Sequence, residues 1–309
     1  MSFKDLDPFL SLKLVGHREN FNFLQNLLSN NFPKTLLLSG KSGIGKLTLV
    51  IHFLNYLHSK SNYNISEMKI DNESNFYQSL FNRSQENIIF LNLSKEKPLK
   101  IDEIRGLKET ISKTLINEKK RYIIINEIET LNHNCLNALL KIIEEPTLNN
   151  YFILINNKTI KLLETIKSRC FEINLNLSEE ERLNIINFLK IKFEILKETE
   201  LDELYLTPGN YINFYNIIEE NNLLNKDYLF SIECLIKLYK KTGRKDYIEL
   251  VKFKTESYFL KLMKQDKDKI EKFSKIKNKI LLTINDYLIY NINFQSVMSS
   301  ILRNCNNAK

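Results

Sequence analysis

The fold is decided by one stretch near the start of the chain, LLLSGKSGIGK at residues 36–46. An apolar run leads into a glycine-rich turn, and a segment with helical apolar spacing follows. Such a turn lets backbone N–H groups close around a phosphate, and the start of the next helix favours the negative charge. Gly40, Gly43 and Gly45 are three of the seven glycines in the chain, so a purely structural glycine turn is the weaker interpretation. The stretch predicts a phosphate-binding loop whose Lys46 reaches the outer phosphates.

The loop departs from the phosphate-binding motif directly after its lysine. The motif G-x-x-x-x-G-K continues with a Ser or Thr whose hydroxyl binds Mg²⁺. Here Leu47 takes that position, and Thr48 comes one residue late. We therefore expect this turn to lack its usual ligand for the metal.

A second departure lies in the run YIIINE at residues 122–127. The run matches a hydrophobic strand that ends in the acidic pair of a Walker B motif, except that the first acid is Asn126. An amide is a much poorer ligand for Mg²⁺ than a carboxylate. Glu127, at the position that would orient water, therefore has no metal beside it. With both ligands lost, we expect hydrolysis to be very poor even if a nucleotide binds.

Outward from the loop, short apolar runs alternate with amphipathic stretches of helical spacing. The runs lie at residues 35–38, 88–93, 122–125 and 152–155. This alternation is typical of a parallel sheet covered by helices on both faces. One predicted helix spans about residues 132–145 and stops at Pro146, which cannot continue it. The polar and weakly patterned residues 59–85 indicate a mobile excursion between two strands. Residues 1–175 are predicted to form an α/β domain.

The rest of the chain has a helical pattern. Ser178 and Glu181 have the spacing of a capping box and open a small helical segment, predicted for residues 176–213. Beyond it, residues 214–309 contain one glycine and no proline, and their apolar residues recur at helical spacing. We expect this tail to be an all-α oligomerisation domain.

Composition limits the class of protein. With 43% hydrophobic and 27% charged residues, and with neither a membrane-spanning run nor a signal peptide, the chain reads as a globular cytoplasmic protein. Its four cysteines lie far apart, so no metal site is expected from them. The net charge of +8 permits contact with nucleic acid, but this signal is weak because many basic proteins have lysine-rich solvated faces.

Five stretches resemble landmarks of clamp-loader subunits of the AAA+ class. They are LVGH at 14–17, GKSGIGK at 40–46, IDEIR at 101–105, NALLKIIEEP at 137–146 and SRC at 168–170. The fourth and fifth stretches together are highly specific to these loaders, whereas either alone would be weak. The resemblance covers residues 10–176 well and the later helices by architecture. It implies an AAA+ P-loop domain, a helical lid and an all-α C-terminal collar.

The resemblance also implies a role without hydrolysis. ATPase subunits of the family keep the hydroxyl after the lysine, the Walker B acid and an arginine in the lid. This chain has Leu47, Asn126 and the arginine-free lid sequence TPGNY at residues 207–211, which resembles the stator type of subunit more than the gamma/tau motors. The sensor position looks like Asn156. Some family members carry a four-cysteine zinc module after the P-loop, and this chain lacks those cysteines, so no zinc role is carried over.

Arg169, in the S-R-C stretch, is implied to reach a neighbouring ATPase subunit as an arginine finger in trans; an interface arginine without a chemical role is the alternative. Glu144 and Glu145 read most simply as helix-end charges. The implied partners are the gamma/tau and delta subunits, the sliding clamp, and primed DNA through the complex. No cofactor would be required; the degenerate loop could hold ATP or ADP without hydrolysis, or hold nothing. Three other readings stay open: an active gamma/tau-type ATPase, an unrelated P-loop ATPase or kinase, and an interaction module that binds no nucleotide.

Overall fold

The computed structural model describes residues 7–93, 99–112, 120–145, 149–195, 201, 205–290 and 292–306. Among these, residues 7–195 together with 207–210 form one compact unit. Residues 201, 205–206 and 211–306 form a second unit. The predicted boundaries after residues 175 and 213 stay predictions.

The first unit is built on a five-stranded parallel sheet with the strand order β4-β5-β6-β1-β7. Its strands are β1 (Thr35–Ser39), β4 (Ile88–Leu91), β5 (Arg121–Ile125), β6 (Asn150–Asn156) and β7 (Phe171–Asn174). The first four coincide with the apolar runs of the sequence. β7 was not predicted, because this edge strand is exposed or half-buried along its length and so needs no apolar run.

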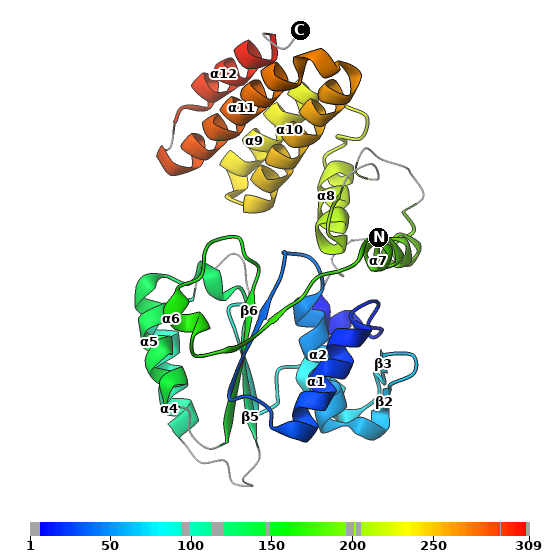
Figure 1. Cartoon of the computed structure of the whole chain (residues 1–309), viewed down its shortest axis with the longest axis vertical. Coiled ribbons are helices and arrows are strands. Elements are labelled where there is room, and N and C mark those ends of the chain that lie inside the picture. The colour runs from blue at the N-terminus through cyan, green and yellow to red at the C-terminus, as the bar shows by residue number, and fades with distance from the viewer. Residues whose placement is uncertain are drawn as a thin grey trace. The chain divides into compact units, whose positions relative to one another are not determined.

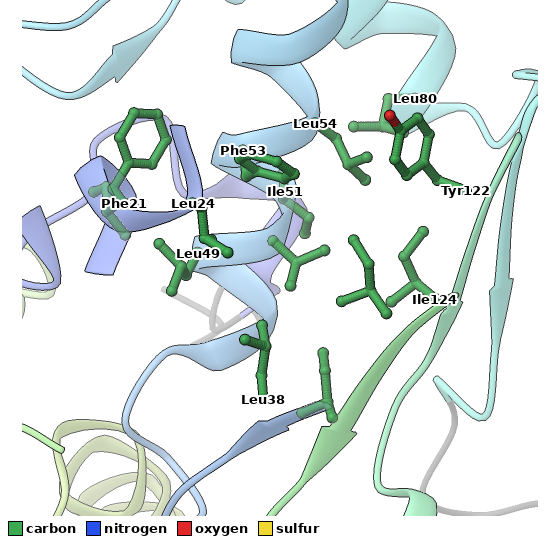
Figure 2. Packing of buried hydrophobic residues seen from close by; sticks show 14 of the residues in the cluster. Phe21, Leu24, Leu38, Leu49, Ile51, Phe53, Leu54, Leu80, Tyr122 and Ile124 are labelled. Carbon is green, nitrogen blue, oxygen red and sulfur yellow. The ribbon is translucent and has the colours of Figure 1, made fainter. Parts of the chain in front are cut away.

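Helices cover both faces of this sheet (Figure 1). One face carries α1 (Arg18–Asn30), α2 (Lys46–His58) and α3 (Asn75–Phe81), and the other carries α4 (Ile101–Ser112) and α5 (His133–Glu144). Successive strand residues point to opposite faces, so that Leu36 and Leu38 join the first core cluster and Leu37 joins the second. Figure 2 shows the first cluster, in which Leu38 and Ile124 of the sheet pack beneath α2. The predicted α/β class is confirmed.

Three local predictions can be compared with the structure. The segment 59–85, predicted as a mobile excursion between two strands, lies between β1 and β4 of the sheet and forms the antiparallel pair β2 (Tyr63–Asn64) and β3 (Lys69–Ile70) and then α3. The predicted capping box is present at the start of α7 (Glu179–Lys192). The predicted helix 132–145 is α5, which ends at Glu144, while Pro146 lies outside the described residues. A short helix, α6 (Glu164–Lys167), precedes β7.

The second unit is helical, as predicted. It contains α9 (Tyr228–Thr242), α10 (Lys245–Gln265), α11 (Ile270–Tyr290) and α12 (Phe294–Asn306), each packed on the next along the chain. The preceding helix, α8 (Pro208–Glu220), begins with residues that belong to the first unit. Gly243 ends α9 in the left-handed conformation that favours glycine after a helix. None of the helices in the described part of the chain is both long and apolar enough to span a bilayer.

Candidate functional site

The P-loop turn, residues 40–45, connects the end of β1 to the start of α2. Gly43 and Gly45 have φ angles of 77° and 93°, in the left-handed region that L side chains rarely adopt. Gly40 is needed for another reason, because a Cβ there would lie 2.5 Å from the carbonyl oxygen of Leu175. Each of the three glycines in the motif is thus required by the backbone of this turn.

Lys46, the first residue of α2, folds its side chain back onto the turn. The residue is buried, and its Nζ donates hydrogen bonds to the carbonyl oxygens of Gly40 (2.7 Å) and Lys41 (2.6 Å). Burial lowers the pKa of Lys46 to about 8, while the carboxylates of Glu129 and Glu127 oppose the shift. The ammonium therefore stays mostly protonated at neutral pH. It can bind a phosphate by exchanging these carbonyl oxygens for phosphate oxygens.

The two altered metal positions lie at this same edge of the sheet. Leu47 is half-buried on the first turn of α2 and packs against the core, and Thr48 follows it. Asn126 directly follows β5, where its backbone carbonyl accepts a 2.8 Å hydrogen bond from Nδ2 of Asn92. Glu127 comes next, half-buried and with a left-handed φ of 49°. Among the described residues, no group of three or more His, Cys, Asp and Glu side chains is placed to bind a metal ion.

Asn156, the predicted sensor position, is the last residue of β6 and lies opposite Ser39 of β1. Its Nδ2 donates a 3.1 Å hydrogen bond to Oγ of Ser39, and its Oδ1 accepts one of 2.9 Å from the backbone N–H of Lys158. Its carbonyl oxygen accepts a 3.0 Å bond from the N–H of Gly40. The structure thus brings Asn156 to the first residue of the P-loop turn, while its sensor role stays a prediction.

Glu129 is a buried acid of this site that the sequence reasoning missed. It lies in the short 3-10 helix η3 (Ile128–Thr130) and is 6% exposed. Its Oε1 accepts a 3.0 Å hydrogen bond from Oγ1 of Thr159, and its Oε2 has no hydrogen-bond partner within the described part of the chain. Burying a charge is costly unless a counter-charge is near, and Lys46 supplies that charge. The available signal was an acid between the apolar residues Ile128 and Leu131, shortly after the predicted Walker B strand.

The arginine-free lid sequence packs directly on the P-loop turn. The N–H of Gly209 donates a 2.8 Å hydrogen bond to the carbonyl oxygen of Gly43. A Cβ on Gly43 would lie 2.6 Å from Oγ1 of Thr207, and one on Gly209 would lie 2.8 Å from Cα of Gly43. Two glycines are therefore needed where these segments meet. No arginine side chain enters the site from residues 207–211.

His17 also contacts the P-loop turn. Its Nδ1 accepts a 3.1 Å hydrogen bond from Nδ2 of Asn20, so the ring proton is on Nε2, which donates a 2.6 Å bond to the carbonyl of Ile44. Burial lowers the pKa of His17, which keeps the ring neutral. The preceding Gly16 packs on Ile185 of α7, where a Cβ would lie 2.8 Å from Cδ1 of the isoleucine. The L-V-G-H stretch thus packs against both the turn and α7.

Arg169 lies in the turn after α6, and its hydrogen bonds go to α5 and α6 rather than to the P-loop. Its Nη2 is 2.6 Å from Oε1 of Glu144, in an ion pair whose side chains are 37% and 43% exposed. Its Nη1 donates hydrogen bonds to the carbonyl of Thr165 and to Oγ of Ser168. Glu144, interpreted from the sequence as a helix-end charge, is therefore the ion-pair partner of Arg169. Burial raises the pKa of Cys170 to about 12, in keeping with a packed thiol.

Comparison with known proteins gives relatives of two kinds. The chain is 27% identical over 266 residues to DNA polymerase III subunit gamma of Buchnera aphidicola subsp. Schizaphis graminum, covering 81% of this chain and 69% of that protein. It is 29% identical over 168 residues to DNA polymerase III subunit delta' of Buchnera aphidicola subsp. Baizongia pistaciae, covering 48% of this chain and 50% of that protein. The delta' subunit of Buchnera aphidicola subsp. Schizaphis graminum is 34% identical over 121 residues, 39% of this chain and 36% of its own length. The chain thus spans half or less of the length of these two delta' relatives.

A solved structure and a family model also match this chain. A gamma-subunit-related protein from Thermotoga maritima is similar at 16% identity, with a TM-score of 0.48 over 94% of this chain and 99% of that one. The model of the family described as "DNA polymerase III, delta subunit" matches residues 16–179, more than half of the 309 residues. The chain therefore belongs to the DNA polymerase III, delta subunit, family, within the clamp-loader family of DNA polymerase III.

Proposed function

We propose that this chain is the delta-prime subunit of the clamp loader, the stator that helps load the sliding clamp onto primed DNA in replication. One observation carries the proposal: the P-loop keeps its glycines and its lysine, while Leu47 and Asn126 replace both ligands of the metal. Without Mg²⁺ the charge that develops on a transferring phosphate is poorly neutralised. The subunit then contributes to the complex through its contacts instead of its own hydrolysis. Its location is the cytoplasm.

The chemical contribution of this subunit is Arg169, acting in trans as an arginine finger on the ATP of a gamma/tau neighbour. Its guanidinium is partly exposed on a turn. Arg169→Ala in the reconstituted loader is expected to lower the ATPase rate with sliding clamp and primed DNA, although less than the ~10³–10⁵ of a sole finger, because the motor subunits keep their own. Arg169→Lys is not expected to restore the rate, since an ammonium lacks the planar fork.

The matched control is Arg244→Ala, which removes another partly exposed arginine in an ion pair with an acid of its own chain. An unchanged ATPase rate in the Arg169→Ala complex, at normal assembly, contradicts the trans role. Copurification of the gamma/tau and delta subunits with this chain tests the partners themselves.

The helical tail is proposed to be the collar that assembles with the other subunits. On α11, Leu282, Ile289 and Tyr290 are 61%, 70% and 71% exposed, and large apolar side chains grouped on a surface are typical of an interaction site. Replacing Leu282 and Ile289 together by Ser is expected to weaken assembly in gel filtration. Lys279→Ser, at an exposed position of the same helix, is the control that should assemble normally.

The degenerate P-loop is proposed to need no nucleotide for assembly and to bind ATP or ADP without hydrolysing it. Equilibrium binding of labelled ATP to the isolated chain tests occupancy, with Lys46→Ala as the variant that should weaken it. If neither protein binds ATP at millimolar concentration, the chain is an interaction module in which the loop is structural.

The alternative function is an active gamma/tau-type ATPase, which the gamma relative favours because its match covers 81% of this chain. Phosphate release by the isolated chain distinguishes the two, since the stator is expected to show none above background. Leu47→Thr with Asn126→Asp should restore little, because the lid also lacks its arginine. The family match is at odds with an unrelated P-loop ATPase or kinase.

A further inference from the structure

An ion pair joins the NALLKIIEEP stretch to the SRC stretch, the two that together are specific to clamp loaders. Glu144 ends α5, and Arg169 lies in the turn after α6. The 2.6 Å contact between Oε1 and Nη2 uses one terminal nitrogen of the guanidinium. The other, Nη1, donates to the carbonyl of Thr165 at 2.9 Å and to Oγ of Ser168 at 3.3 Å. Both terminal nitrogens of Arg169 are therefore bound within its own chain.

The position of Glu144 has no explanation in the stability of α5 itself. A helix C-terminus carries partial negative charge, so an acid in the last turn is unfavourable there. Glu144 is in that turn, and Glu145 follows as the C-cap residue. The ion pair to Arg169 gives Glu144 a favourable interaction that the helix does not supply.

A finger that neutralises a phosphate needs the same two nitrogens that Glu144, Thr165 and Ser168 occupy. An arginine binds phosphate oxygens best through a planar fork of parallel N–H bonds. An exposed ion pair is weak, so a neighbour's nucleotide, which carries more charge than one carboxylate, can take its place. The pair is therefore strong enough to bias the resting arginine and weak enough to be exchanged.

We propose that Glu144 holds Arg169 in an inactive position. The carboxylate keeps the guanidinium on its own subunit until a neighbouring nucleotide site closes and a phosphate of that site replaces the carboxylate. This inference rests on the proposed trans role of Arg169. Glu144 is a positioning residue, since it acts through Arg169 and touches no nucleotide. The ion pair keeps ATP hydrolysis low when the interface with the neighbouring ATPase subunit is open.

The test is the steady-state ATPase rate of the reconstituted loader, with and without sliding clamp and primed DNA. Glu144→Gln keeps the shape of the side chain and removes its charge. It is expected to raise the unstimulated rate about 1.5- to 5-fold, the equilibrium effect of losing one exposed ion pair. The stimulated rate should change less, so the ratio of the two falls. Glu145→Gln removes the same charge one residue later and should leave both rates unchanged.

Variants of Arg169 distinguish a failure of the proposed role of Glu144 from a failure of the proposed trans role of Arg169. If Glu144 acts through Arg169, the double variant Glu144→Gln/Arg169→Ala has the rates of Arg169→Ala alone. If Arg169→Ala lowers the stimulated rate but Glu144→Gln behaves like Glu145→Gln, the proposed role of Glu144 is wrong and the trans role of Arg169 is retained. A lowered stimulated rate in Glu144→Gln also contradicts the proposed role of Glu144, because Glu144 would then hold Arg169 in its active position. If Arg169→Ala changes nothing, both proposals fail.

Discussion

The imidazole Nε2 of His17 donates a 2.6 Å hydrogen bond to the carbonyl of Ile44, and this bond ties the chain before α1 to the middle of the P-loop turn. His17→Ala leaves that buried carbonyl without its donor. We expect the variant to lower the free energy of unfolding by about 1–3 kcal/mol, measured by urea denaturation. His133→Ala, at an exposed position, is the control and should change it by less than about 0.5 kcal/mol. Equal effects of the two substitutions would contradict a structural role for His17.

The second prediction concerns the pH dependence of stability. His52 is buried between Ser11 and Tyr63: one ring nitrogen bonds the carbonyl of Ser11 at 2.8 Å and the other the Tyr63 hydroxyl at 3.0 Å. Burial lowers its pKa from 6.5 to about 4. Between these two pH values the unfolded chain binds a proton at His52 that the folded chain does not. The stability that neutral His52 contributes is therefore fully present above pH 6.5 and is lost as the pH falls towards 4.

Urea midpoints measured across this pH range check the effect. His52→Gln cannot be protonated, and its stability should fall less steeply with pH than that of the wild type. Some slope should persist, because burial lowers the pKa of His17 as well. His133→Gln, the same substitution at an exposed position, is the matched control. Parallel curves for His52→Gln and the wild type would show that the pKa of His52 does not differ between the folded and the unfolded chain.

The third prediction concerns the electrostatics of the P-loop lysine. Among the acids that raise the pKa of Lys46, Glu129 has the larger effect and Glu127 the smaller. Glu129→Gln is therefore expected to move the pKa of Lys46 below about 8, and Glu127→Gln should move it less. A titration of the Lys46 side chain by NMR measures both. If Glu129→Gln leaves the pKa where it is, the buried carboxylate is not the counter-charge of Lys46.

The fourth prediction tests the contact between the lid sequence and the P-loop turn. Gly209→Ala places a Cβ 2.8 Å from Cα of Gly43, so the segments must separate, and we expect a loss of stability of about 1–3 kcal/mol. Gly106→Ala is the control, because a Cβ there has nothing within 4 Å. In the middle of α4 it should stabilise the chain by about 0.5–1 kcal/mol. Thermal unfolding that ranks the two variants in the opposite order would contradict the contact.

Local sequence patterns were sufficient to predict the structure around the P-loop. The run 36–46 required a strand, a glycine turn and a helix, because each segment has the composition of one structure alone. The apolar runs of β1, β5 and β6 were visible because these strands lie inside the sheet. That of β4, an edge strand, was visible because its side chains pack against both core clusters. The capping box of α7 was visible because its two residues lie three apart and bond each other's backbone.

Features that depend on residues far apart in the sequence could not be predicted from local patterns. β7 carries no strong pattern, because pairing with β1 along one edge stabilises it without burying a full apolar run. The burial of Glu129 beside Thr159, and the ion pair of Glu144 with Arg169, join segments that meet when the parallel sheet forms. Local sequence fixes backbone propensity and the spacing of apolar side chains. Which charged groups then face each other is set by packing, since a charge is stabilised by whichever counter-charge the fold brings within a few ångströms.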